Sequence, residues 1–276
     1  MPSTLSRDQE TELTERQLHL LKVVRERGFA TIEALAELFE VSAQTVRRDV
    51  IRLDAAGLLQ RFHGGAGVAD DQVRLGYKEK QELAVPSKAR IGTLAAGLVP
   101  DGASLYLDVG TTVEAVAHAL VQRALGPVFT NNMAAAAILA ENRQVEVYVT
   151  GGVLRGSDGS LVGDAAAAAL RAVAVDIAII GCSGFAEDGS PMDFDPQKVA
   201  VKNAALAHAR RAIVVADATK FARGAVMRIA EAKRFSTVVS DRAPPRDLAG
   251  RLAEAGVAVL TPDDDGSGEE RLRAGG

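Results

Sequence analysis

SAQTVRRD, residues 42–49, has the pattern of a helix that begins at a capping serine and presents polar side chains outward. The Ser42 hydroxyl can accept a hydrogen bond from a backbone amide of the first helical turn. Val46, Val50 and Leu53 follow one another at i, i+4 and i+7, so they form one inward-facing apolar stripe. The opposite side of the predicted helix then carries Gln44, Thr45, Arg47, Arg48 and Arg52.

These outward side chains suit contact with double-stranded DNA. Gln and Arg can make paired hydrogen bonds to adenine and guanine edges, while Arg and Thr also reach phosphates. A pair of arginines on an isolated helix is more often a solvated face. The interpretation as a DNA-reading helix therefore depends on the segments around it.

The segments before this helix predict two further helices. Residues 14–17, TERQ, form a capping-box pattern that opens a helix stopped by Gly28. Thr31 caps a second, shorter helix. Its inward positions are expected to be Ile32, Leu35, Leu38 and Phe39. Two helices joined by a tight turn make a helix-turn-helix, whose second member enters the major groove.

A β-wing is expected after the reading helix, which ends at Gly57. Residues 58–68 have the pattern of two short strands around a glycine turn. Arg61 and His63 on the first of these strands can touch phosphates or the minor groove. The three helices and the wing together predict a winged helix-turn-helix domain over residues 14–68.

The same stretch resembles a known protein family. VSAQTVRRD, followed by LDAAGLLQRFHGGA, is similar to the N-terminal domain of the DeoR family of bacterial transcriptional regulators. The similarity covers residues 14–66. It implies operator DNA as a partner.

Composition limits the class of protein. The chain has 276 residues, which suffices for two domains, with 47% hydrophobic and 25% charged residues. No apolar run approaches the ~18 residues that span a membrane, and no apolar segment near the N-terminus suggests a secretory signal. The single cysteine, Cys182, excludes an internal disulfide and suits a reducing cytoplasm. With only four scattered histidines, the sequence predicts neither a metal site nor a cofactor.

The charge distribution limits how DNA is bound. The net charge is −4, and residues 1–65 carry nine Lys/Arg against ten Asp/Glu. Residues 42–63, by contrast, carry four arginines against two aspartates. DNA contact must therefore come from a local basic patch, which we expect to be doubled in a dimer or tetramer.

A second domain of α/β type is predicted over residues 88–262. Short apolar runs, each followed by a small or polar turn and a helix, lie at 104–107, 128–130, 145–150, 176–180, 212–216, 237–240 and 257–260. This alternation predicts a mostly parallel sheet with helices on both faces. Ser87 is expected to cap the first helix of this domain. The remaining segments are interpreted as a flexible tail (1–13), a linker (69–87) and a disordered tail (263–276).

Polar and glycine residues follow the predicted strands, where open α/β sheets bind ligands. The helix N-terminus at residues 110–112 favours an anion, and Lys202 and Lys220 are candidate cations for a phosphate. Asp108 and Asn131 suit the hydroxyls of a sugar or glycerol. The predicted effector-binding residues are Asp108, Gly110, Thr111, Thr112, Asn131, Gly151, Gly152, Ser183, Gly184, Lys202 and Lys220.

Simpler interpretations of these residues stay open. Glycine pairs are more often turns, and Asp108 and Asp176 can be structural caps. Cys182 is more simply a small buried residue than a nucleophile. No Ser/His/Asp set or pair of carboxylates suggests hydrolysis.

The second domain also resembles the sensor domain of the DeoR family. The similar stretches are DVGTT, FTNN, TGG, DIAIIGCSG and VVADATKF, between residues 108 and 221. The resemblance implies a fold like ribose-5-phosphate isomerase and a phosphorylated sugar as effector. Within the family, GTTVEAVAHAL, FTNNMAAA, LRGSDGSLVGDA and DGSPMDFDPQKVAVK are most similar to the glycerol-3-phosphate regulon repressors.

Four residues depart from the family pattern. Lys198 replaces the usual Glu, Ala200 replaces the Arg of the glycerol repressors, and Thr219 and Ala222 replace Ser and Gly. If Lys198 and Lys202 both face the pocket, the ligand is more anionic than glycerol 3-phosphate.

The expected function is a transcriptional repressor that a phosphorylated metabolite releases from DNA. Two alternatives stay open. One is an enzyme that interconverts sugar phosphates, although only Asp108 or Asp176 offers a general base. The other is a transcriptional activator, which would have the same sequence features.

Overall fold

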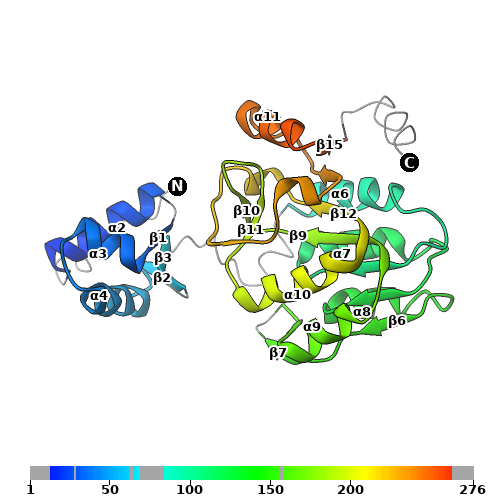
Figure 1. The fold of residues 1–276 in the computed structure, drawn as a ribbon, viewed down its shortest axis with the longest axis horizontal. Helices are drawn as coiled ribbons and strands as arrows, with labels where there is room; N and C mark the ends of the chain where they lie inside the picture. The colour runs from blue at the N-terminus through cyan, green and yellow to red at the C-terminus, as the bar shows by residue number, and fades with distance from the viewer. Residues whose placement is uncertain (1–12, 28, 63–64, 69–83, 156–157, 263–276) are drawn as a thin grey trace. The chain divides into compact units, whose positions relative to one another are not determined.

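The computed structural model describes residues 13–27, 29–62, 65–68, 84–155 and 158–262. The chain divides into two compact units, residues 1–75 and 76–276 (Figure 1). Each unit has its own hydrophobic core. No helix among the described residues is long and apolar enough to cross a membrane.

The N-terminal unit is a winged helix-turn-helix. Its elements are α2 (Glu15–Arg27), β1 (Phe29–Thr31), α3 (Ile32–Leu38), α4 (Ala43–Ala55), β2 (Leu59–Phe62) and β3 (Gly65–Val68). The three strands form an antiparallel sheet in the order β1-β3-β2. The sequence predicted the helices and the two wing strands. It did not predict β1, which is only three residues long and follows α2 closely.

The helix starts follow the predicted capping chemistry. The Thr14 hydroxyl accepts from the Gln17 amide at 3.3 Å, and the Gln17 side chain accepts from the Thr14 amide at 3.1 Å. The Thr31 hydroxyl accepts from the Ala34 amide at 3.0 Å. These contacts confirm the predicted starts of α2 and α3.

The core of this unit matches the predicted apolar stripes except at Leu38 and at Leu18, which was expected to face inward with Leu21 and Val24 of α2 but is 37% exposed. Val46, Val50 and Leu53 of α4 are fully buried, as is Leu35 of α3 to within 1%. Leu38 was expected to face inward, but it is 45% exposed. It lies six residues after Ile32, so the helical rotation carries it roughly 120° away from that stripe.

The C-terminal unit is built on a seven-stranded parallel sheet in the order β15-β14-β12-β9-β4-β5-β6. The strands are β4 (Leu105–Leu107), β5 (Val128–Thr130), β6 (Val147–Val149), β9 (Val175–Gly181), β12 (Ala209–Val215), β14 (Thr237–Val239) and β15 (Ala258–Leu260). Each overlaps one of the seven predicted strands. The predicted α/β class with a parallel sheet is therefore confirmed.

Helices cover both faces of this sheet. One core packs against α6 (Val85–Gly97), α7 (Thr111–Leu120) and α8 (Met133–Leu139). The other packs against α9 (Asp164–Arg171), α10 (Pro196–His208) and α11 (Arg246–Glu254). Successive residues of β4 and β9 alternate between the two cores, as the two-residue period of a strand requires.

The start of α6 differs from the prediction. Ser87 was expected to cap this helix, but α6 begins at Val85, with Ala84 as its N-cap and no side-chain cap. Pro86 suits the first helical turn because its fixed φ is already helical and its missing N–H is not needed there. Further along α6, a Cβ on Gly92 would lie 2.4 Å from the Ala115 carbonyl oxygen, so glycine permits the close crossing of α6 and α7.

Short elements flank the carboxyl ends of the sheet strands. β7 (Val153–Arg155) and β8 (Ser160–Val162) form an antiparallel pair. A second small sheet joins β10 (Gly184–Phe185), β11 (Pro191–Asp193) and β13 (Met227–Arg228). Two 3₁₀ turns, η1 (Ala218–Lys220) and η2 (Ala232–Arg234), complete the unit. The sequence did not predict these strands.

Candidate functional site

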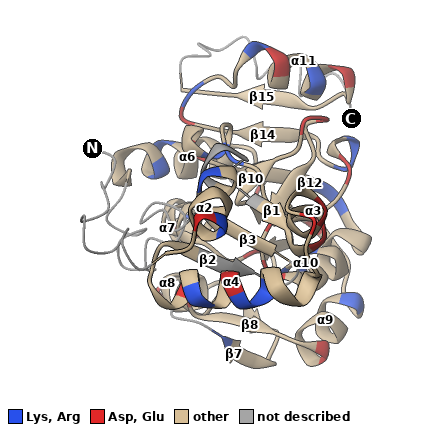
Figure 2. Ribbon diagram, turned by 90° about the vertical axis from the view of Figure 1, so that its left-hand side faces the viewer, with Lys and Arg blue, Asp and Glu red and all other residues tan. Residues whose placement is uncertain are grey.

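The exposed side of α4 carries the predicted DNA-reading residues. Ser42, Gln44, Arg47, Arg48 and Arg52 are exposed, and Thr45 is half-buried. The Ser42 hydroxyl accepts from the Thr45 amide at 3.1 Å, which fixes the start of the helix. Figure 2 shows the basic and acidic segments of α4. This arrangement offers hydrogen-bond donors to DNA from a helix whose other side is packed.

Asp49 has a structural role that the sequence did not predict. It is buried, and its carboxylate accepts from Arg16 Nε at 2.6 Å and from Gln17 Nε2 at 2.9 Å. Burial raises the pKa of the Asp49 carboxyl, but these hydrogen bonds outweigh it and hold the pKa below its ordinary value. The contacts join α2 to α4 and fix the orientation of the reading helix. The sequence signal that could have indicated this role is the position of Asp49, an acidic residue on the apolar stripe three residues after Val46.

The wing residues are only partly described. Arg61 lies on β2 and pairs with Ala66 of β3, but the position of its side chain is outside the described structure. His63 lies outside the described residues. Their predicted contact with DNA stays a prediction.

In the C-terminal unit, the predicted effector residues gather along the edge where the parallel strands end. Asp108 follows β4, Asn131 follows β5, and Gly151 and Gly152 lie between β6 and β7. Ser183 and Gly184 follow β9, Lys220 lies in η1 after β12, and Lys202 comes from α10. Their side chains divide into a buried network and a pocket.

The buried network centres on Lys202. Its ammonium group pairs with the Asp108 carboxylate, lies 3.4 Å from Asp193 Oδ2 and donates to the Gly181 carbonyl oxygen at 2.9 Å. Asp108 Oδ2 also accepts from the Gly181 amide at 3.0 Å. Lys202 is 1% exposed and Asp108 is 0% exposed. These charges therefore satisfy one another inside the protein.

The pKa directions in the network follow from burial and from two carboxylates that share one ammonium. Burial raises the pKa of the Asp108 carboxyl above its ordinary value, although Lys202 opposes it. Burial alone would lower the pKa of Lys202, but Asp108 and Asp193 raise it above its ordinary value. Lys202 is thus held in its charged form.

Asn131 belongs to the same interior. It is 0% exposed, accepts from the Tyr106 hydroxyl at 2.8 Å and donates to the Leu161 carbonyl oxygen at 3.0 Å. Asp108, Asn131 and Lys202 therefore hold the strand ends together in this structure, and their polar groups are already engaged.

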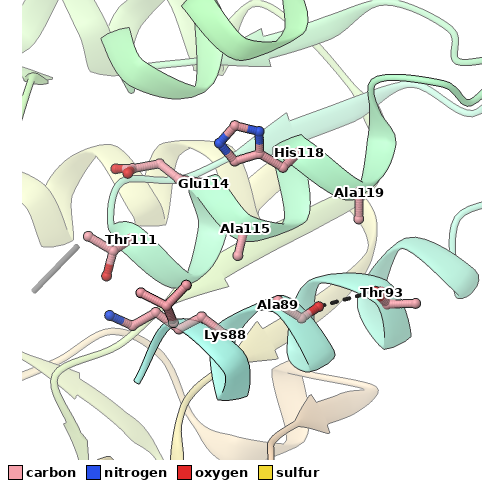
Figure 3. Close-up of a pocket in the computed structure, with 9 residues that line it drawn as sticks. Lys88, Ala89, Thr93, Thr111, Glu114, Ala115, His118 and Ala119 are labelled. Carbon is pink, nitrogen blue, oxygen red and sulfur yellow. Dashed lines mark hydrogen bonds between the residues drawn. The ribbon is translucent and has the colours of Figure 1, made fainter. Parts of the chain in front are cut away.

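The pocket lies between α6 and α7, with a volume of about 540 Å³ (Figure 3). It is lined by Val85, Lys88, Ala89, Thr93, Thr111, Glu114, Ala115, His118 and Ala119. In Figure 3, Lys88 of α6 and Thr111 and Glu114 of α7 occupy one end, and Thr93 and Ala119 lie toward the other. The end near Thr111 coincides with the N-terminus of α7, which favours an anion.

Lys88 is a candidate functional residue that was not predicted from the sequence. It is buried, and burial lowers the pKa of its ammonium group below the ordinary value. Asp217, Lys220 and Glu114 are close enough to influence this pKa, with Lys220 lowering it and the two carboxylates raising it. Lys88 lies on the buried stripe with Ile91 and Ala95, and a lysine in such a stripe was the available signal.

Gly110 and Thr112 flank Thr111 at this helix start. Gly110 is the N-cap of α7, with a φ of +122° that favours glycine and with no side-chain cap. Thr112 is buried. The first-turn amides of α7 therefore lie beside Thr111 without competition from a capping side chain.

The remaining predicted residues lie in turns and close backbone contacts. A Cβ on Gly152 would lie 2.6 Å from the Val162 carbonyl oxygen, and one on Gly184 would lie 2.1 Å from the Arg223 carbonyl oxygen. Gly151 is exposed. The Ser183 hydroxyl donates to Asp193 Oδ1 at 3.2 Å. Gly152, Gly184 and Ser183 therefore have close contacts within the protein, and effector binding by these residues and by Gly151 stays a prediction.

Cys182 and Lys198 are also explained by their surroundings. Burial raises the pKa of the Cys182 thiol to about 12, which keeps it from acting as a thiolate near neutral pH. Lys198 pairs with Asp158, whereas Lys202 pairs with Asp108. The two lysines thus have separate carboxylate partners, and neither lines the pocket between α6 and α7, so the condition for a more anionic ligand is not met there. Within the described residues, no cluster of His, Cys, Asp and Glu could hold a metal ion.

Comparison with known proteins agrees with both units. Residues 16–72 match the family model described as the DeoR-like helix-turn-helix domain, and residues 84–242 match the DeoR C terminal sensor domain. The chain is 35% identical over 257 residues to the HTH-type transcriptional repressor CsqR of Escherichia coli, which covers 92% of this chain and 98% of that protein. It is 34% identical over 232 residues to the glycerol-3-phosphate regulon repressor of Escherichia coli, covering 84% and 92%.

A comparison of structures finds a more distant likeness. Ribose 5-phosphate isomerase A from Neisseria gonorrhoeae has 14% sequence identity and a TM-score of 0.36 over 51% of this chain and 54% of that chain.

Proposed function

This chain belongs to the DeoR family of transcriptional regulators, and on that basis we propose that it is a cytoplasmic repressor of a carbohydrate or glycerol catabolic operon, released by a phosphorylated metabolite. Its relatives named above are transcriptional repressors. The chain is a regulator and not an enzyme, so the isomerase alternative is set aside.

The observation that carries the proposal is that α4 has one buried apolar side and one exposed polar side. Val46, Val50 and Leu53 are fully buried, and Asp49 fixes the helix to α2. The polar face is left exposed, and a rigid helix can enter a major groove in one orientation. Specific recognition needs this rigidity, because paired hydrogen bonds to base edges depend on geometry.

Residues 1–65 carry nine Lys/Arg against ten Asp/Glu, which makes a single copy of this unit a weak binder. Two or four copies on repeated half-sites would add their contacts. We therefore include a homodimer or homotetramer in the proposal.

The pocket supports a phosphorylated effector. Lys88 lines the pocket and supplies positive charge, with Lys220 close enough to influence the Lys88 pKa, and Thr111 supplies a hydroxyl beside the first-turn amides of α7. A phosphate needs such donors and cations. The candidates are glycerol 3-phosphate and common sugar phosphates. A coupling of ~1–3 kcal/mol between the two sites would change operator affinity roughly 5- to 150-fold.

The DNA-binding half is tested by fluorescence titration of the upstream intergenic DNA at ~150 mM salt. Arg48→Ala should weaken specific binding roughly 5- to 150-fold, since one good base contact contributes ~1–3 kcal/mol. Arg143→Ala, at an exposed arginine of the other unit, is the matched control and should bind as wild type. Specific binding by Arg48→Ala within threefold of wild type would contradict the reading role of α4.

The effector half is tested by thermal shift against glycerol 3-phosphate, sugar phosphates and inorganic phosphate. A ligand at a hundred times its Kd stabilises by ~2.7 kcal/mol, so a true effector raises Tm. Lys88→Met should lose most of this shift, while Lys233→Met, at an exposed lysine, should keep it. Full retention of the shift in Lys88→Met would rule out this pocket.

A transcriptional activator has the same two units. Transcript levels of the neighbouring operon in a deletion strain distinguish a repressor from an activator. A repressor predicts a rise on deletion, and an activator predicts a fall.

A further inference from the structure

The pocket between α6 and α7 has two parts with different chemistry. Its charged side chains, Lys88 and Glu114, lie together with the Thr111 hydroxyl beside the N-terminus of α7, and we call this part the charged end (Figure 3). The remainder, which we call the apolar part, is lined by Ala89, Thr93, Ala115, His118 and Ala119. A phosphate at the charged end explains only the first of these two parts.

The apolar part is formed by small side chains on the facing sides of two helices. Ala89 and Thr93 of α6 lie four residues apart, as do Ala115 and Ala119 of α7. Residues at this spacing share one face of a helix. Figure 3 shows Ala115 and Ala119 turned toward α6. Because an alanine side chain ends at its Cβ, these positions leave space between the helices beyond the charged end.

The apolar part offers few groups that could bind a ligand hydroxyl. The Thr93 hydroxyl donates its proton to the Ala89 carbonyl oxygen at 3.1 Å, so it can only accept from a ligand. The backbone amides inside α6 and α7 are bonded within their helices. The ring of His118 is the other polar group of this part, and His118 is exposed to solvent. A ligand hydroxyl placed against the alanines would lose water without gaining a partner.

We propose that this pocket takes a phosphomonoester whose body beyond the phosphate is largely apolar. The phosphate lies at the charged end, near Lys88 and Thr111, and the apolar body extends between the helices toward Ala119. The volume of about 540 Å³ has room for both, since it lies within the range of pockets that hold drug-sized ligands. The inference rests on the proposed function for its phosphate, and it narrows the effector to the least hydroxylated class of phosphorylated metabolites.

The proposal is tested by calorimetric titration of the full chain with two esters that share a phosphate and a three-carbon chain. Glycerol 3-phosphate carries two hydroxyls that propyl phosphate lacks. Propyl phosphate should bind at least ~10-fold more tightly, since a hydroxyl buried without a partner is costly. Butyl phosphate should bind roughly fourfold more tightly again, the effect of burying one more methylene. Glycerol 3-phosphate that binds as tightly as propyl phosphate, or an affinity that does not rise from propyl to butyl phosphate, would overturn the proposal.

The position of the apolar body is tested at Ala119. Ala119→Leu fills the part of the pocket farthest from Lys88, so it should weaken butyl phosphate at least ~10-fold and leave inorganic phosphate within about twofold of wild type. Ala168→Leu, at an exposed alanine of α9, is the matched control and should keep both wild-type affinities. Unchanged binding of butyl phosphate in Ala119→Leu would overturn the proposal.

A smaller substitution covers the case in which Ala119→Leu does not fold, which circular dichroism reveals. Ala119→Ser adds a hydroxyl with little change in volume, so it should reduce the preference for propyl phosphate over glycerol 3-phosphate at least ~3-fold. A preference equal to that of wild type would contradict the proposed position of the ligand.

The operator titration separates this proposal from the proposed function. Esters that bind in the expected order but do not release operator would keep the pocket assignment and contradict the effector role alone. Esters that release operator but bind in the opposite order, with glycerol 3-phosphate tightest, would overturn the proposal and keep the proposed function. If neither inorganic phosphate nor any of the esters binds, the proposal and the effector half of the proposed function are both wrong.

Discussion

Replacing Lys202 by Met should destabilise the C-terminal unit by about 3–5 kcal/mol, the cost of breaking a buried ion pair by removing one partner. Met fills a similar volume, so the loss is electrostatic. Asp108 is 0% exposed and would keep the Gly181 amide at 3.0 Å, the Tyr106 hydroxyl at 3.4 Å and a backbone hydrogen bond from Val109, but no cation in contact. Water cannot solvate the carboxylate that is left behind.

The magnitude has a physical limit, because the stranded carboxyl can take up a proton. With an ordinary pKa of about 3.9, protonation at pH 7 costs about 4 kcal/mol, and at pH 5 about 1.5 kcal/mol. In the variant, the folded-state pKa of Asp108 lies above its unfolded value. The difference in stability between wild type and variant should therefore narrow as pH falls from 7 to 5.

The assay is urea unfolding followed by tyrosine fluorescence. The chain has no Trp, and its three tyrosines, at 77, 106 and 148, all lie in the C-terminal unit. Adding Asp108→Asn to Lys202→Met should recover most of the lost stability, since it removes the stranded charge. Lys233→Met is the exposed control. A loss below about 1 kcal/mol, or a double variant no more stable than the single one, would refute the proposed pairing.

Two further predictions concern charge and backbone. Asp49→Asn should lower the stability of the N-terminal unit by about 1.5–3 kcal/mol, because a charge-assisted hydrogen bond with Arg16 is lost. The folded-state pKa of Asp49 is depressed, so its contribution is present above about pH 4 and disappears as pH falls through that pKa. Calorimetry should show that the difference in stability between wild type and Asp49→Asn shrinks as the pH falls. A difference that stays constant down to pH 3 would contradict the role given to the Asp49 charge. Glu40 and Ala84 hold left-handed φ values of 52° and 55°, so glycine at either should stabilise its own unit by roughly 0.5–1 kcal/mol. A lower Tm in either glycine variant would be the contrary result.

Local features were predictable because their physics is local. The cap at Ser42 depends on a hydroxyl and an amide three residues apart, and the stripe of α4 depends on helical period alone. The seven sheet strands were visible as apolar runs, and the central strands β4 and β9 are apolar because they are buried on both faces. The two-residue strands β10 and β13 form no apolar run of their own, so nothing in the sequence indicated them.

The candidate sites also divide into features set by neighbours in the chain and features set by contacts between distant residues. By itself, the sequence determined the exposed polar face of α4 and the helix start at Thr111, both of which follow from neighbours in the chain. Only the tertiary structure decided that Lys202 neutralises Asp108, 94 residues away, and that Lys88 faces the α7 N-terminus. It also gave Lys198 a partner of its own in Asp158. Whether a charge binds a ligand or holds the protein together depends on which opposite charge the fold brings within contact, and separation along the chain does not reveal that distance.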